Sequence, residues 1–350
     1  MSIDTLAPLA AAPIRRGLTR SGWILLPALL TALVFPFLVK DYFLFQATMM
    51  LSYAVALLGL NILTGYNGQI SLGHGAFFAM GAYTAAILMD SAGLPYWATI
   101  PAAAGICLLV GYLFGLPALK LEGLYLALAT FALGVALPQL LKYKHLEVWT
   151  GGVQGIVLMK PDAPFGLPLT PDQWLYLFAL GVVLLMFWLA HHLLRSGIGR
   201  AMIAIRDNPL AAETMGIDNR HYKATVFGFS AMYTGIGGAL SAIAVQFVAP
   251  DSFTVFLSIS LLVGIVVGGL ATIAGAFYGA AFIMFVPSLA ENISKAAPAA
   301  VYGIVLILFV FILPGGVAGL MDRLSRRFGT LKACPSELTN SRPAATCVAR

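Results

Sequence analysis

Residues Arg195 to Lys223 read RSGIGRAMIAIRDNPLAAETMGIDNRHYK, and this stretch decides how the chain is organised. Two apolar runs flank it, Gln173 to Leu194 and Tyr222 to Phe247, and each is long enough to cross a bilayer with about 30 Å of hydrocarbon. The chain as a whole is 60% hydrophobic and 10% charged, whereas this stretch is too charged to lie in lipid. We therefore interpret it as a loop between two membrane spans. Its charged residues are Arg195, Arg200, Arg206, Asp207, Glu213, Asp218, Arg220 and Lys223.

Apolar runs repeat along most of the chain and predict an all-α, polytopic membrane helix bundle. Backbone groups in lipid must form hydrogen bonds within the protein, which helices and closed β-barrels allow. These runs lack the alternation of polar and apolar residues that barrel strands show, so helices are expected. About ten transmembrane segments can be marked, and eight spans with a re-entrant pair fit as well. Basic residues do not cluster on a soluble domain, which argues against nucleic-acid binding. The segments are Trp23 to Val39, Tyr42 to Thr64, Ile70 to Met89, Tyr96 to Leu116, Leu124 to Leu141, Trp174 to Leu194, Tyr222 to Phe247, Phe253 to Leu270, Ile273 to Ala290 and Ala299 to Leu313.

The positions of Lys and Arg predict the orientation of the bundle. With the N-terminus inside, the inner segments carry roughly three times as many Lys and Arg residues as the outer ones, as the positive-inside rule requires. We therefore expect both termini in the cytoplasm. The expected parts are a cytoplasmic N-terminal segment (1–22), a transmembrane domain (23–320) and a basic, disordered cytoplasmic tail (321–350). Within the transmembrane domain, 195–223 is expected inside and 142–172 outside.

The segment Leu63 to Tyr83, LTGYNGQISLGHGAFFAMGAY, differs from a simple lipid-facing span. Small residues four apart, such as Gly75 and Ala79, allow close helix approach, so we expect this segment inside the bundle. Its polar side chains either bond neighbouring helices or line a polar path, and the sequence leaves both open. These side chains are Asn67, Gln69, Ser71 and His74.

The outer loop contains WTGGVQGI at Trp149 to Ile156. Its glycines permit positive φ angles, so a tight turn is the simplest interpretation. A turn on this face could also dock a partner or close a gate. The candidate residues for the gate are Thr150, Gly151, Gly152, Gln154 and Gly155.

Several kinds of chemistry have no motif in the sequence. No Asp or Glu falls within the body of a marked span, which argues against proton coupling. The phosphate-binding pattern GxxxxGK[ST] is absent, so we expect no cofactor on this chain and, if transport is active, an energy source on another subunit. An intramembrane enzyme would need a nucleophile elbow, paired carboxylates or a metal cluster, and the sequence contains no catalytic or metal-binding motif of these kinds. An ATP-independent carrier or channel is the other alternative.

Five motifs together resemble the permease subunits of branched-chain amino-acid ABC importers, the LivM-type branch in particular. The resemblance runs in order over roughly Tyr42 to Leu320. The motifs are GYNGQISLGHGAFFAMGAY, LEGLYLALATFALG, WTGGVQGI, IGRAMIAIRDNPLAAETMGID and ILPGGVAGL.

This resemblance implies a set of partners: a second, homologous permease, two cytoplasmic ATPase subunits that hold ATP with Mg²⁺, an external substrate-binding protein and the lipid of a bacterial inner membrane. It also implies that a short helix in the central loop transmits ATP-driven movement, with a plain solvated loop as the alternative. Independently, Pro209 suits a first helical turn and Gly216 suits a helix end. The coupling residues implied are Arg206, Asp207, Pro209, Ala211, Ala212, Glu213 and Gly216.

The resemblance does not fix the substrate. The amides of Asn67 and Gln69, the hydroxyl of Ser71 and the imidazole of His74 are candidates to pass a zwitterionic amino acid without a fixed charge. A path needs weak contacts so that the substrate can leave. Similar permeases are associated with urea and short amides, and a more distant branch with sugars. Branched-chain or related amino acids are the expected substrates, with these as alternatives.

Overall fold

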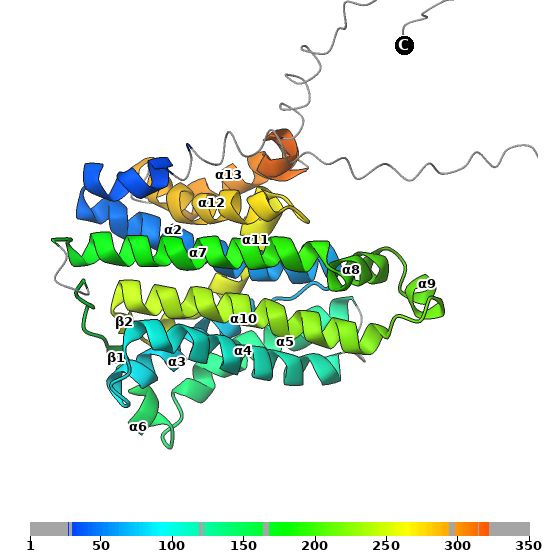
Figure 1. Ribbon diagram of the computed structural model, residues 1–350, viewed down its shortest axis with the longest axis horizontal. Helices are drawn as coiled ribbons and strands as arrows, with labels where there is room; N and C mark the ends of the chain where they lie inside the picture. Colours follow the sequence, from blue (N-terminus) through cyan, green and yellow to red (C-terminus); the bar gives the residue numbers. More distant parts are fainter. Residues whose placement is uncertain are drawn as a thin grey trace, which may run out of the picture.

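The computed structural model describes residues 27, 30–118, 121, 123–163, 168–293, 298–313 and 315–321. Long helices run side by side in one bundle, as expected of an all-α membrane protein (Figure 1). The expected N-terminal segment (1–22) and nearly all of the expected tail (321–350) lie outside the described residues.

The elements in chain order are α2 (Asp41–Asn61), the π-helical turn η1 (Ile62–Tyr66), α3 (His74–Asp90), α4 (Tyr96–Ala118), α5 (Leu124–Leu141), α6 (Glu147–Thr150), β1 (Ile156–Val157), α7 (Pro171–Arg195), α8 (Gly197–Asp207), α9 (Pro209–Thr214), α10 (Asn219–Val245), β2 (Phe247–Val248), the 3-10 turn η3 (Pro250–Ser252), α11 (Val255–Gly268), α12 (Ile273–Ile293) and α13 (Pro298–Ile312).

Within the described residues, seven helical segments are long and apolar enough to cross a membrane. They correspond to seven of the ten expected segments. Of the other three, α3 has 17 residues and α13 has 15, so both are shorter than a typical span. The first expected segment, Trp23 to Val39, is described only in part, and residues 30–38 of it are helical.

Helix α10 is the centre of the bundle and packs against α2, α3 and α4. Its glycines allow this, because a Cβ on Gly238 would collide with the carbonyl of Phe78 in α3. From the other side, a Cβ on Gly81 of α3 would collide with the carbonyl of Gly235 in α10. The expectation that α3 lies inside the bundle is confirmed, and small residues at its helix contacts are the reason.

The connections gather at two ends of the bundle (Figure 1). We call the end that carries α8 and α9 the α9 end. The opposite end, which we call the β end, carries β1 and β2, paired antiparallel with Ile156 opposite Val248. An ion pair of 2.5 Å between Lys142 Nζ and Asp251 Oδ1 also lies at the β end.

The segment before α3 differs from the expected span. Ile70 to Met89 was expected to be one helix, but α3 begins only at His74, and residues 68–73 are not helical. Gly68 has a φ of +75°, which breaks the helix after η1. The chain therefore turns back at the α9 end and enters the bundle as a non-helical segment before α3 starts.

Candidate functional site

Helix α9 is a short helix with a defined start and end. The Asn208 side chain caps it by accepting a 3.0 Å hydrogen bond from the Ala211 amide, and Pro209 is its first residue. At its other end Gly216 has a φ of +83°, and its amide donates to the Glu213 carbonyl over 3.0 Å. The Ile217 amide donates to the Ala212 carbonyl over 3.1 Å, which completes a Schellman motif. Pro209 and Gly216 thus begin and end the helix as the sequence predicts.

Helix α9 turns one face toward the protein and leaves the rest exposed. Ala212 is buried against the chain, whereas Leu210 is 77% exposed and Met215 is 85% exposed. The Asn219 side-chain amide donates a 2.8 Å hydrogen bond to the Pro209 carbonyl, which fixes α9 to the start of α10. The result is an anchored apolar protrusion beyond the ends of the long helices (Figure 1).

Arg206, near the end of α8, connects this protrusion to the membrane helices. Its Nη1 donates a 3.0 Å hydrogen bond to the carbonyl of Gly65 in η1. Its Nε and Nη2 donate to Asp207 Oδ1 over 3.0 and 2.9 Å. A Cβ on Gly68 would lie only 2.9 Å from Arg206 Cγ, so the chain after η1 packs directly on this side chain. Movement of α8 would therefore act on η1 and on the segment that leads to α3.

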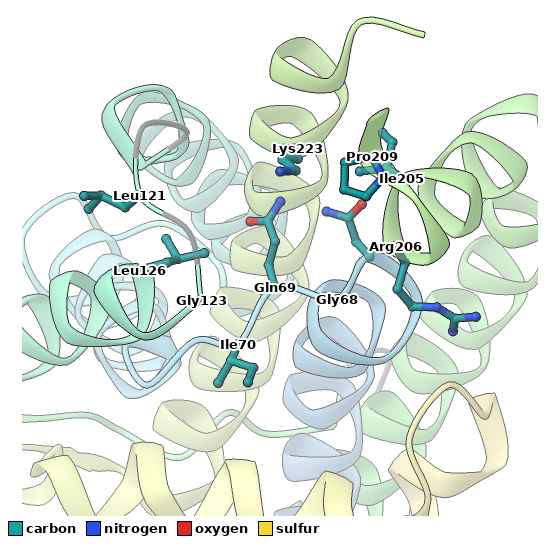
Figure 2. Close-up of a pocket in the computed structure, with 11 residues that line it drawn as sticks. Gly68, Gln69, Ile70, Leu121, Gly123, Leu126, Ile205, Arg206, Pro209 and Lys223 are labelled. Atoms are coloured by element: carbon teal, nitrogen blue, oxygen red, sulfur yellow. The ribbon is translucent and has the colours of Figure 1, made fainter. Parts of the chain in front are cut away.

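A pocket of about 190 Å³ lies between these elements at the α9 end. We call it the α9-end pocket. Figure 2 shows Gln69 reaching between Leu121 and Leu126 on one side and Pro209 on the other. The lining residues are Asn67, Gly68, Gln69, Ile70, Leu121, Gly123, Leu126, Ile205, Arg206, Pro209 and Lys223.

The four polar residues of the candidate path fall into two groups. Asn67 and Gln69 line the α9-end pocket. Asn67 is 3% exposed, and among the described residues neither its Nδ2 nor its Oδ1 has a hydrogen-bond partner. The same holds for Gln69 Nε2. Ser71 and His74 lie deeper and do not line this pocket.

His74 links three helices through a buried chain of hydrogen bonds. Its Nε2 is 2.6 Å from Ser230 Oγ in α10, and its Nδ1 is 2.8 Å from Ser71 Oγ. The Ser230 hydroxyl donates to the Gly59 carbonyl of α2 over 2.6 Å. Because Ser230 gives its proton to Gly59, we assign the donor role to His74 Nε2 and the acceptor role to Nδ1. Both ring nitrogens are thus satisfied by the protein itself, which favours a helix-linking role.

The first amides of α3 are also satisfied by the protein. The Gly75 amide donates to Ser258 Oγ of α11 over 2.9 Å. Just before the helix, the Leu72 amide donates to Thr130 Oγ1 of α5 over 3.0 Å. These hydroxyls replace solvent at a helix start that lies inside the bundle, where bare amides would be costly.

The outer-loop candidates lie in or directly after α6, next to β1, at the opposite end of the bundle from α8 and α9 (Figure 1). Thr150 is buried, and its hydroxyl donates to the Leu141 carbonyl over 2.8 Å. Gly151, Gly152 and Gly155 all have positive φ angles, so the tight turn is confirmed. Gln154 is exposed, and strand β1 follows directly.

Sequence reasoning missed Asn61, the last residue of α2, which bonds the connection between α11 and α12. Its Nδ2 donates to the Thr272 carbonyl over 2.7 Å, and its Oδ1 accepts from the Ala271 amide over 2.9 Å. These residues lie between α11 and α12, so one side chain fixes the end of α2 to that connection. A carboxamide inside a long apolar run is the signal that could have indicated it.

The described residues contain no group of three or more His, Cys, Asp or Glu side chains that could hold a metal ion. Cys107 is buried and unpaired.

Comparison with known proteins gives one family and two curated relatives. The family model described as "Branched-chain amino acid transport system / permease component" matches residues 42–313. The high-affinity branched-chain amino acid transport system permease proteins LivM of Salmonella typhimurium and Escherichia coli are each 30% identical over 331 residues, covering 88% of this chain and 77% of the relative. No solved structure matches.

Proposed function

This chain belongs to the permease-component family of branched-chain amino acid transport systems and is a permease subunit of an ABC importer, and we propose that it carries branched-chain or related amino acids inward. It is a multi-pass membrane protein. The named relatives transport branched-chain amino acids, which supports this substrate class for the present chain. Because both relatives are bacterial, we place it in the bacterial inner membrane.

The proposed complex contains four kinds of subunit. This chain pairs with a second, homologous permease, and two cytoplasmic ATPase subunits bind to the α9 end and hold the ATP and Mg²⁺. A substrate-binding protein delivers the amino acid to the β end. In this arrangement the chain is a transport subunit and catalyses no reaction of its own.

The observation that carries the proposal is the anchored, exposed helix α9. Leu210 of this helix is 77% exposed and Met215, directly after its last residue, is 85% exposed, in a connection between two long membrane helices. A short helix with an exposed apolar face and two fixed ends is suited to lie in a groove of a partner. We propose that this partner is the ATPase, with Arg206, Asp207, Pro209, Ala211, Ala212, Glu213 and Gly216 forming the coupling element.

The route for the movement begins at α9. Helices α9 and α8 are in contact, and Arg206 of α8 bonds the Gly65 carbonyl of η1 over 3.0 Å. From η1 the chain runs through Asn67 and Gln69 to Ser71 and His74, where it is bonded to α10. A shift of α9 would thus change the position of the 67–73 segment, which we propose as part of the substrate path. Thr150, Gly151, Gly152, Gln154 and Gly155 remain our candidates for an outer gate.

Uptake by the reconstituted complex tests this function. Proteoliposomes with all four kinds of subunit are supplied with labelled leucine, urea or ribose, with and without internal ATP. Concentrative uptake of leucine that requires ATP is the expected result. Uptake of urea or ribose in place of leucine would overturn the substrate class, and leucine accumulation without ATP would overturn the ABC mechanism proposed for this chain.

A further inference from the structure

The α9-end pocket contains polar groups whose hydrogen bonds the described protein does not satisfy. Asn67 is 3% exposed with both amide atoms unpartnered, and Gln69 Nε2 is also buried and unpartnered. Leaving such groups without partners inside a protein costs free energy, and native structures normally satisfy them. Both side chains line the pocket, so a molecule in the pocket is the partner within their reach.

The other residues that line the pocket indicate which chemical groups that molecule carries. Four aliphatic side chains, Ile70, Leu121, Leu126 and Ile205, line it beside the two carboxamides. The amide nitrogens of Asn67 and Gln69 can donate to a carboxylate, and the Asn67 oxygen can accept from an ammonium group. The aliphatic side chains suit an apolar group of modest size, since the volume is about 190 Å³.

We propose that the α9-end pocket is an inside-facing binding site for a small zwitterionic amino acid with an aliphatic side chain. The proposal rests on the proposed function for its substrate class, and adds the place where the amino acid is held before it leaves. The carboxamides hold the two charged groups and the aliphatic wall holds the side chain. Arg206 and Lys223 also line the pocket, so the carboxylate meets positive charge as well as the carboxamide donors.

The walls of this site explain how release is linked to the ATPase. Ile205 and Arg206 belong to α8, Pro209 belongs to α9, and Asn67 and Gln69 belong to the segment that leads to α3. An amino acid in the pocket therefore touches both the helices that face the ATPase and the proposed substrate path. Movement of α8 and α9 would change the shape of the site and release its occupant.

Equilibrium binding to the complete complex in nanodiscs, without the substrate-binding protein, tests the proposal. The probe is tritiated leucine. We expect saturable binding that excess unlabelled leucine displaces, while leucinamide, which lacks the carboxylate, and 4-methylpentanoate, which lacks the ammonium group, compete at least about tenfold less well. Absence of saturable leucine binding, or equal competition by either analogue, would overturn the proposal without any substitution being made.

Substitutions locate the site. Asn67→Leu and Gln69→Met keep the approximate side-chain shape and remove the hydrogen-bonding groups, so each should weaken leucine binding about tenfold or more. Gln139→Met makes the same kind of change at an exposed position near the end of α5 and should bind as the wild type does. Wild-type binding by both pocket variants, with the complex intact by size-exclusion chromatography, would contradict the assignment.

A parallel uptake assay separates the two proposals. If the complete transporter with its binding protein accumulates leucine but shows no inside-facing leucine binding, the site is wrong and the proposed function stands. If it accumulates no leucine at all, the proposed function itself fails.

Discussion

The Arg206 guanidinium and the Gly65 carbonyl oxygen are joined by a 3.0 Å hydrogen bond between α8 and the π-helical end of α2. Gly65 lies where α2 loses regular helical bonding, so its carbonyl has room for an outside donor. Arg206 also bonds Asp207 through two of its nitrogens. This one side chain thus connects the cytoplasm-facing helices we propose to the start of the substrate path.

Replacing Arg206 should separate ATP hydrolysis from transport. Arg206→Ala removes the bond to Gly65 and should lower leucine uptake per ATP hydrolysed about tenfold, with hydrolysis itself maintained. Stability should fall by about 1–2 kcal/mol, because the Gly65 carbonyl loses its donor whereas the Arg206–Asp207 pair is partly solvated and contributes little. Arg200→Ala is the matched control, since the Arg200 side chain is exposed and, among the described residues, its hydrogen bond is to the nearby Arg195 carbonyl, over 3.4 Å. Equal ratios of uptake to ATP hydrolysis in both variants would show that Arg206 does not transmit movement from α9 to η1.

Substitutions at the end of α9 should distinguish backbone strain from docking. A Cβ on Gly216 would meet no described atom within 4 Å, so the chain itself has space for a side chain there. Asn tolerates the φ of +83°, and Gly216→Asn should therefore keep most uptake. Gly216→Arg adds bulk where we place the ATPase and should insert normally but lose uptake, as should Glu213→Lys. The measurement is ATP-driven uptake at matched membrane levels, and normal uptake by Gly216→Arg would argue against docking at this position.

The exposed apolar residues of α9 should bind the ATPase subunits. Leu210→Ser combined with Met215→Ser removes two large side chains that are 77% and 85% exposed. We expect co-purification of the ATPase to fall about tenfold or more, because exposed apolar anchors often contribute most of an interface's affinity. Val157→Ser makes the same kind of change at the β end, where the side chain is 74% exposed. Retention of the ATPase by the double variant would show that α9 is not its principal contact.

His74 should contribute to the stability of the folded protein by linking α3 to α10. His74→Ala leaves the buried hydroxyls of Ser71 and Ser230 with one partner fewer and opens a cavity, which should cost about 2–4 kcal/mol of unfolding free energy. A lower thermal midpoint of the purified protein is the measurement, and His74→Gln should restore part of it because its amide can replace one ring hydrogen bond. An unchanged midpoint with lost uptake would instead make His74 a residue of the substrate path.

The sequence predicted those features of the fold that depend on residues close together in the chain. The charge of residues 195–223 excludes them from lipid, and Pro209 and Gly216 carry the backbone preferences that start and end α9. The packing of α3 was also predictable, because small residues four apart indicate close helix contact.

The division of the polar residues in 67–74 could not be predicted, because it depends on distant partners. His74 is satisfied by Ser230, which is 156 positions away in the sequence. Asn61 bonds residues 210 and 211 positions away. Hydrogen bonds over such separations follow from the helix arrangement, which a single sequence does not define.

The side of the membrane that α9 faces tests the account most directly. Glu213→Cys, with Cys334 and Cys347 changed to Ser, provides an exposed thiol on α9 while Cys107 stays buried. A membrane-impermeant maleimide should label this thiol in inside-out vesicles and leave it unlabelled in right-side-out vesicles. Labelling in right-side-out vesicles would place α9 outside the cell and contradict its role as the contact for the ATPase.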